Sequence, residues 1–275
     1  MTELLKFSRQ PELQNPFLVV GWNGDVGSLG SSVTNYLNKK LGGQSFGEIE
    51  PIEFFPLAGV TIQDDLVQFP ESRFYAFPRN DLVVFRSDPP SYDWYRFLSL
   101  ILDAAENWQV KEVHTIGGMV SFGAHTAPRE LMGTFNSPEL KEELSAYNLN
   151  TEMNYETPPG QRPTLNSFLL WVAKRRNIPG LSLWVPIPFY LITLNDPKAE
   201  KRLLEFFNRR FDLGMDLSDL DGEIKNQNAR LARARASSPE IDESISRLER
   251  NLSLLPEENQ RLVSEIEKFL REKKG

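Results

Sequence analysis

Short apolar runs alternate with longer amphipathic stretches along the first two thirds of the chain. The run FLVVGW at 17–22 is rich in β-branched and aromatic residues and predicts a buried strand. The next stretch, 28–41, places Val33, Tyr36 and Leu37 on one face, which predicts a helix. The two segments are joined by a glycine-rich turn, so the chain opens with a strand, a turn and a helix.

The same alternation continues to about residue 211. We predict further strands at 52–55, 73–77, 82–86, 112–118, 131–135 and 181–186, and helices at 88–108, 138–147, 164–177 and 196–211. Asp196 is expected to cap the last of these helices, with Pro197 at its first position. Strands that alternate with helices favour an α/β fold, a three-layer α/β/α sandwich with a mostly parallel sheet covered on both faces.

The composition changes at Met215, where aromatic residues almost disappear and charged residues dominate. Apolar residues then recur at helical spacing, at Leu217, Leu220, Ile224, Leu231, Ile241, Ile245, Leu248, Leu252 and Leu255. Breaks near 237–239 and at Pro256 predict a coiled-coil-like helical hairpin. We therefore expect a core domain at 1–214 and a C-terminal α-helical extension at 215–275. The extension either packs on its own or a neighbouring subunit, or docks a different protein.

Composition and charge exclude several classes of protein. The chain has 275 residues, of which 40% are apolar and 25% charged, as in a globular protein. It has no cysteine and two histidines, so disulfides and ordinary zinc sites are not expected, and we expect no metal. A net charge of −7 opposes binding to nucleic acid. No apolar run is long enough to cross a membrane and the first residues lack a signal core, which predicts a cytoplasmic protein.

The turn GWNGDVGSLG at 21–30 is the first candidate for chemistry. Its glycines fall three residues apart, and no lysine follows Gly27 as a phosphate-binding P-loop requires. The dinucleotide fingerprint also fails on this spacing. Backbone N–H groups at the start of the next helix could hold an anion, although Asp25 would repel it. The candidate ligand-binding residues are Gly24, Asp25, Gly27 and Ser28, and the alternative is a tight strand-to-helix turn.

The second candidate is IGGMVSFGAHT at 116–126, which follows a predicted strand. It contributes Gly117, Gly118, Ser121 and His125 as candidate ligand-binding residues. Ser121 and His125 could form a hydrolytic dyad on paper, but the glycine of a nucleophile elbow is missing, and we assign no catalytic residue. Both glycine-rich loops follow strands, so they could share one rim of the sheet.

Two remaining polar features fit structural roles better than catalytic ones. His114 alternates within a predicted strand and is expected in or near the core. Asp64 and Asp65 could form an acid–base pair, but aspartates are common in turns, and we favour a turn here.

Five ordered segments resemble the proteasome assembly chaperone family, whose prokaryotic members are often labelled ATP-grasp-like. They are FLVVGWNGDVGSLGSSVTNYL, VHTIGGM, HTAPRELMGTFNSPEL, GQRPTLNSFLLWVAKRRNIPGLSLWVPIPFYL and DPKAEKRLLEFFNRRFDLGMDLSDL. The resemblance spans about residues 17 to 220. It implies a sandwich similar to nucleoside phosphorylases, self-association, and a role in guiding proteasome ring assembly.

Two departures from the family qualify this expectation. Some members end in a hydrophobic-Tyr-any tripeptide that inserts between proteasome subunits, whereas this chain ends Glu272-Lys273-Lys274-Gly275. The phosphate-binding spacing that the ATP-grasp label would suggest is also missing, so no cofactor is expected.

Two classes of function follow. The first is a non-enzymatic scaffold or assembly-chaperone-like protein, a homo-oligomer of three or more copies that could hold a protein partner through its C-terminal helices. The second is a small-molecule enzyme, a ligase or phosphorylase-like protein, with a pocket between the loops at 21–30 and 117–125. A pocket filled by apolar side chains would count against the enzyme.

Overall fold

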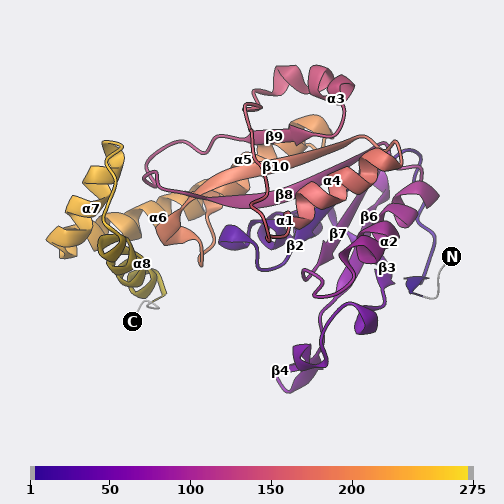
Figure 1. Cartoon of the computed structure of the whole chain (residues 1–275), viewed down its shortest axis with the longest axis horizontal. Helices are drawn as coiled ribbons and strands as arrows, with labels where there is room; N and C mark the ends of the chain where they lie inside the picture. The colour runs from indigo at the N-terminus through magenta and orange to yellow at the C-terminus, as the bar shows by residue number, and fades with distance from the viewer. Residues whose placement is uncertain (1–3, 272–275) are drawn as a thin grey trace.

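A computed structural model describes residues 4–271, so the chain ending compared above with the family tripeptide lies outside the described residues. The fold is the predicted α/β/α sandwich, with three further helices at the C-terminal end (Figure 1). The strands are β1 (Leu5–Phe7), β2 (Phe17–Trp22), β3 (Gln44–Ile49), β4 (Thr61–Gln63), β5 (Leu66–Gln68), β6 (Ser72–Phe77), β7 (Leu82–Ser87), β8 (Glu112–Ser121), β9 (Met132–Phe135) and β10 (Gly180–Pro188). The helices are α1 (Leu29–Leu41), α2 (Trp94–Asn107), α3 (Pro138–Glu143), α4 (Leu165–Arg175), α5 (Pro197–Arg210), α6 (Ser218–Ser237), α7 (Pro239–Glu249) and α8 (Pro256–Arg271).

The main sheet has eight strands in the order β1-β3-β6-β7-β2-β8-β10-β9. Its centre is parallel, because β7, β2, β8 and β10 all run in the same direction. Antiparallel strands complete it on both sides, with β6, β3 and β1 at one edge and β9 at the other. The carboxyl ends of β2, β7, β8 and β10 therefore share one edge of the sheet.

Two hydrophobic clusters cover the two faces of the sheet. Along β2, Val19 belongs to the cluster under α1 and α5, whereas Leu18 and Val20 belong to the cluster under α2 and α4. This division follows from the alternation of side chains along a strand, since both neighbours of an inward residue face the other layer. The continuous apolar sequence of β2 is thus explained by burial on both faces.

Most predicted elements are present, and the predicted cap of α5 is confirmed. The Asp196 carboxylate accepts hydrogen bonds from the backbone N–H groups of Lys198 and Ala199, at 3.1 and 3.0 Å. His114 is fully buried in β8, as expected for a core histidine. Asp64 and Asp65 form the turn between β4 and β5, which confirms the turn interpretation.

The strand predicted at 52–55 is wrong. Pro51–Glu53 form a 3-10 helix, and the strand of this region is β3, which ends at Ile49. Pro51 has no backbone N–H to donate to a strand neighbour. Phe54 and Phe55 are apolar because they fill the cluster under α2, not because they extend the sheet.

The C-terminal helices pack on the chain that carries them. Leu231, Ile245 and Ile266 are fully buried and join the cluster that contains α1 and α5. Helix α8 lies against the 3-10 turn Phe189–Leu191 that follows β10. The apolar series does not continue through Leu252 and Leu255, which are exposed because they lie in the loop between α7 and α8. Within residues 4–271, every helix is too short or too polar to cross a membrane.

Candidate functional site at the carboxyl edge of the sheet

The two glycine-rich loops meet at one edge of the sheet. β2 and β8 are parallel neighbours, so the turn after β2 and the end of β8 lie side by side. A Cβ atom placed on Gly118 would collide with the backbone carbonyl of Val26. Gly118 therefore permits direct backbone contact between the loops. The two loops share a rim in this geometry, but the rim is tightly packed.

Asp25 occupies the place where an anion would bind. Its carboxylate accepts the backbone N–H of Gly30, in the first turn of α1, at 3.0 and 3.1 Å. Burial raises the pKa of Asp25 to about 6, while the backbone N–H groups of Gly30 and Gly118 act in the opposite direction. The free N–H groups at a helix start attract anions. Here the chain supplies that anion itself, so an external phosphate would have to displace Asp25.

The space between the loops is filled by Ile187 of β10. Gly27 has a φ of 69°, and a Cβ on it would collide with the Cδ1 atom of Ile187. The N–H of Gly27 donates to the carbonyl of Ile192 at 2.8 Å, and Ser28 follows in the left-handed region with a φ of 51°. An apolar side chain and backbone hydrogen bonds thus close the site.

Gly24 and Gly117 do not face the space between the two loops. Gly24 has a φ of 70°, and a Cβ placed on it would meet no atom within 4 Å, so it serves the turn alone. Gly117 faces the opposite layer, where a Cβ would lie 2.5 Å from the ring of Trp184. Nearby, the side chain of Asn166 accepts from the indole N–H of Trp22 at 2.7 Å and donates to the carbonyl of Ile116 at 2.9 Å. Neither glycine lines a cavity with Asp25.

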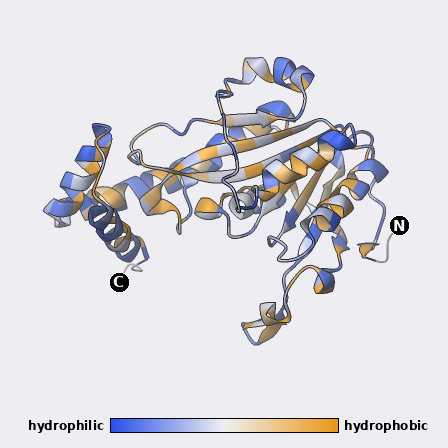
Figure 2. Cartoon of the chain, viewed as in Figure 1, coloured by the Kyte–Doolittle hydropathy of each residue, from blue (hydrophilic) through white to orange (hydrophobic). Residues whose placement is uncertain are grey.

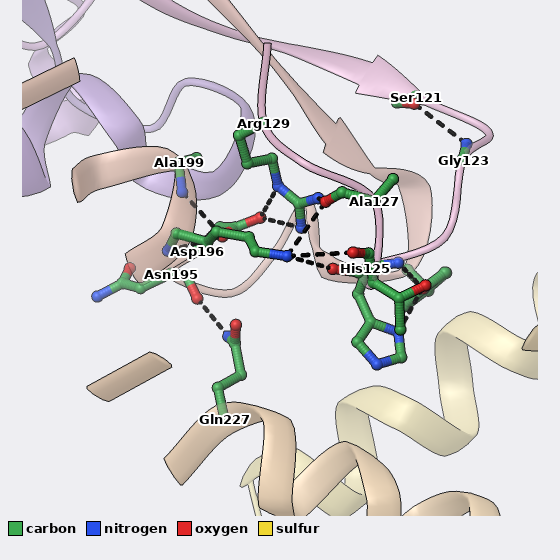
Figure 3. A network of polar contacts seen from close by, with 12 residues as sticks. Ser121, Gly123, His125, Ala127, Arg129, Asn195, Asp196, Ala199 and Gln227 are labelled. Carbon is green, nitrogen blue, oxygen red and sulfur yellow. Dashed lines mark hydrogen bonds and ion pairs between the residues drawn. The ribbon is translucent and has the colours of Figure 1, made fainter. Parts of the chain in front are cut away.

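Ser121 and His125 form no dyad. The Ser121 hydroxyl accepts the backbone N–H of Gly123 at 3.1 Å (Figure 3). Nδ1 of His125 instead lies 2.9 Å from the hydroxyl of Tyr190. Burial, with a smaller contribution from the positive charge of Arg235, lowers the pKa of His125 to about 4. The histidine is therefore neutral near pH 7, and its Nδ1 atom contacts Tyr190 and not Ser121.

A buried polar network, missed by the sequence analysis, fixes the loop after β8 (Figure 3). Arg129 and Asp196 form an ion pair at 2.8 Å, with side chains 4% and 0% exposed. The ammonium group of Lys198 donates to the carbonyls of His125 and Ala127, each at 3.1 Å. Asp196 was identifiable as a helix cap, but no sequence spacing indicated its second partner, 67 residues away.

The same loop is tied to the C-terminal helices. Thr126 donates to Glu249 of α7 at 3.1 Å, and Glu249 also pairs with Arg235 of α6 at 2.8 Å. These contacts and the shared hydrophobic cluster hold the helices against the edge of the sheet.

An open polar cavity of about 410 Å³ lies farther along this edge. It is lined by Asn23, Gly59, Thr61, Gln63, Gln68, Phe69, Pro70, Glu71, Arg73, Arg86 and Asp88. Arg73 pairs with Glu71 at 2.7 Å, the Asp88 carboxylate accepts the backbone N–H of Glu71, and Arg86 donates to Tyr75 and Asn35. Within the described part of the chain, no cluster of three His, Asp or Glu side chains is arranged to hold a metal.

Comparison with known proteins identifies the family of this chain. The sequence model of the PAC2 family matches residues 18–235. The chain belongs to this family. The match covers β2 through most of α6, and the resemblance to proteasome assembly chaperones is confirmed. No curated protein sequence matches the chain significantly.

Solved structures share the PAC2 fold at low sequence identity. A Mycobacterium tuberculosis protein of unknown function, Rv2714, has a TM-score of 0.77 at 19% identity, covering 91% of this chain and 89% of its own. PbaB of Pyrococcus furiosus, described as an archaeal proteasome activator, has a TM-score of 0.69 at 21% identity, covering 84% and 98%. Rv2125 of M. tuberculosis, described as a proteasome-assembly chaperone homologue, has a TM-score of 0.69 at 18% identity, covering 83% and 99%.

Proposed function

We propose that this PAC2 protein is a non-enzymatic scaffold of the cytoplasm, an assembly-chaperone-like protein that acts by protein contact as a homo-oligomer of three or more copies. The family assignment supports an assembly role, because solved relatives include a proteasome activator and a proteasome-assembly chaperone homologue. The core of residues 1–214 carries the self-association, and the helices of 215–275 add a second surface.

The closed edge of the sheet carries this proposal. An enzyme of this architecture would use the rim where β2 and β8 end. There the Asp25 carboxylate takes the anion position, and Ile187 fills the gap between Gly27 and Gly118. We assign the loops at 21–30 and 117–125 a structural role, with Ser121 and His125 serving loop geometry. The ligase or phosphorylase-like alternative was expected to have its pocket between these two loops, where Ile187 and the Asp25 carboxylate lie, whereas the open cavity lined by Asn23 lies farther along the edge.

The outward face of the C-terminal helices is the proposed contact for a protein partner. Their inner face packs on the chain's own core, so the outer face is free for contact. Leu252 and Leu255 are 50% and 55% exposed in the loop between α7 and α8. A cavity of about 190 Å³ between α7 and α8 is lined by both acidic and basic groups, among them Glu240, Arg247 and Glu265. Such a mixed surface favours a polar, specific protein partner over a membrane or a polyanion.

The oligomeric state of the full chain is the first test. Light scattering coupled to size exclusion, at several concentrations, should give a mass of three or more copies. In parallel, a panel of nucleotides, sugar phosphates and carboxylic acids is added and the melting temperature is recorded. A ligand present at 100 times its Kd should raise Tm by roughly 5–10 °C, and we expect no such rise. A monomeric mass, or a large rise with turnover of that ligand, would overturn the scaffold proposal.

A further inference from the structure

The hairpin of β4 and β5 exposes apolar side chains far from the core. Ile62 and Val67 face each other across its two strands and are 76% and 74% exposed, and Leu66 is 62% exposed. The hairpin projects beyond the rest of the α/β body, and hydrophobic residues lie on its projecting end (Figures 1 and 2). Ile62 and Val67 share one face of the hairpin, and exposed apolar side chains gathered in this way mark an interaction surface.

The turn makes this patch well defined. Gln63 pairs with Leu66, so the turn has two residues, Asp64 and Asp65, with φ values of 51° and 63°. Positive φ at both positions is the type I′ turn, whose twist matches that of the flanking strands. A two-stranded hairpin by itself is only marginally stable in water. Burial of its exposed apolar pair against a surface outside the subunit would therefore stabilise the hairpin.

The same chain carries a surface suited to it on α2 and α4. The rings of Tyr95 and Phe168 lie 6.5 Å apart, and those of Phe168 and Trp171 lie 5.7 Å apart. Tyr95 and Trp171 are 53% and 48% exposed. The Arg175 guanidinium lies 5.2 Å from the Trp171 ring centre, beside the exposed Lys174. We call Tyr95, Phe168, Trp171 and Arg175 the aromatic ridge.

We propose that the β4–β5 hairpin of one copy docks on the aromatic ridge of a second copy. Apolar Ile62 and Val67 would cover the rings, and the acidic pair Asp64 and Asp65 would approach the basic end of the ridge. The charges are complementary, which favours this occupant over a second hairpin, whose tip carries the same two negative charges. The proposal rests on the proposed oligomeric scaffold and names its contact surface.

The contact joins two different surfaces, so each copy offers both a hairpin and a ridge. Head-to-tail contacts of this type build rings when the rotation closes. They also permit complementation, because a copy without a working hairpin still has its ridge. This property separates the proposal from symmetric pairing of two hairpins.

The test uses three full-length variants. Ile62→Ser with Val67→Ser disables the hairpin, Trp171→Ser disables the ridge, and Tyr155→Ser is the control, since Tyr155 is 69% exposed in a separate loop. Light scattering should give monomers for the hairpin variant and for the ridge variant. An equimolar mixture of the two should contain a 1:1 complex, and the control should keep the wild-type mass.

Several results would overturn the proposal. If the ridge variant alone keeps the wild-type mass, or the mixture forms no complex, the hairpin does not dock on the ridge. If the hairpin variant keeps the mass while the wild type is oligomeric, the proposed function stands and this interface is wrong. A wild type that is monomeric at every concentration overturns both. Circular dichroism confirms that each variant is folded.

A charge variant gives an independent measurement. Asp64→Asn with Asp65→Asn keeps the turn, since Asn tolerates the left-handed region, and removes both charges. We expect self-association about threefold to tenfold weaker and less sensitive to salt than in the wild type. Unchanged affinity and an unchanged salt dependence would contradict the charge match.

Discussion

Two regions at the same end of the sheet differ in the exposure of their apolar side chains. β3 is antiparallel to β6, and β6 to β7, so β3 runs parallel to the central strands and the hairpin that follows it rises from their carboxyl edge. Along this edge, Ile187 is fully buried between the loops after β2 and β8, whereas Ile62 of the hairpin is 76% exposed. We call the first region the closed rim and the second the open hairpin.

This difference separates residues that hold the fold from residues available for contact. In the closed rim the two loops pack backbone against backbone, the Asp25 carboxylate lies at the start of α1, and Arg129 and Asp196 form a buried ion pair. Changes there should therefore reduce stability. The open hairpin packs on little of its own subunit, so changes there should reduce association and leave the fold intact. The predictions below test this division, beginning with the largest expected effect.

Removing Arg129 should cost the most stability. Arg129→Met leaves the Asp196 carboxylate buried without its cationic partner, although Asp196 still accepts two N–H groups at the start of α5. Breaking a buried pair in this way costs about 3–5 kcal/mol of unfolding free energy. Urea denaturation followed by tryptophan fluorescence measures the loss.

Arg176→Met is the matched control for that substitution. Arg176 pairs with Asp103 at 2.6 Å, but the side chains are 23% and 40% exposed, so the cost should stay within about 1 kcal/mol. Equal losses for the two variants would show that the rim network is no more important than a surface ion pair.

Gly27 and Gly24 have nearly the same backbone conformation but different surroundings. Gly27→Ala combines a strained φ with a collision against Ile187, and we expect a loss of about 2–4 kcal/mol. Gly24→Ala meets open space and should lose only about 1 kcal/mol from the φ strain. The same denaturation experiment compares them.

The double variant Gly27→Ala with Ile187→Val sharpens this result. Shortening Ile187 by one methyl group relieves the collision, so the double variant should be more stable than the sum of the single losses predicts. Additive losses would mean that Ile187 does not close the rim.

Buried acidic groups near α1 should make stability fall as the pH rises. Burial, with a smaller contribution from Glu223, raises the pKa of Glu200 to about 7, and burial raises that of Asp25 to about 6. The protonated form is favoured in the folded state, so this stability is full below the ordinary carboxyl pKa and is lost as the pH passes 6 to 7. Glu200→Gln should therefore gain up to roughly 3 kcal/mol relative to the wild type between pH 4 and pH 8.

His125 has the opposite sign in an overlapping range. Its folded pKa of about 4 lies below its ordinary value of 6.5, so its contribution is present above pH 6.5 and is lost as the pH falls toward 4. Thermal melts are recorded from pH 4 to pH 8 for the wild type, Glu200→Gln and the exposed control Glu130→Gln. They distinguish the contribution of Glu200 from that of His125, because Glu200→Gln removes only the first. A Glu200→Gln profile parallel to that of the wild type would contradict the buried carboxylate.

Local sequence patterns predicted most of the sandwich, because its central elements follow regular periods. The strand at 17–22 and the helix capped by Asp196 were both predicted, since burial on two faces and helix capping leave clear local patterns. Strand β3 was missed because the pairing register shifts between Ser45 and Gly47, which breaks the two-residue alternation. The segment at 52–55, with three apolar residues, Ile52, Phe54 and Phe55, was predicted as the strand instead.

The candidate site was predictable only in part. Sequence placed the loops at 21–30 and 117–125 on one edge, because both follow parallel strands. It could not show that Ile187, far along the chain, fills the space between them, since that depends on tertiary packing. The open hairpin was visible only as a turn at Asp64 and Asp65, because exposure of Ile62 and Val67 leaves no local pattern.

The smallest effect on folding is expected in the open hairpin. Ile62→Ser with Val67→Ser removes side chains that are already in water, so the unfolding free energy of dilute protein should change by less than about 0.5 kcal/mol. The effect should appear instead in the concentration dependence of Tm, because association stabilises only the folded state. Tm of the wild type should rise with protein concentration, whereas Tm of the variant should stay constant. A loss above about 2 kcal/mol in dilute protein would place the hairpin among the residues that hold the fold, and the division between closed rim and open hairpin would fail.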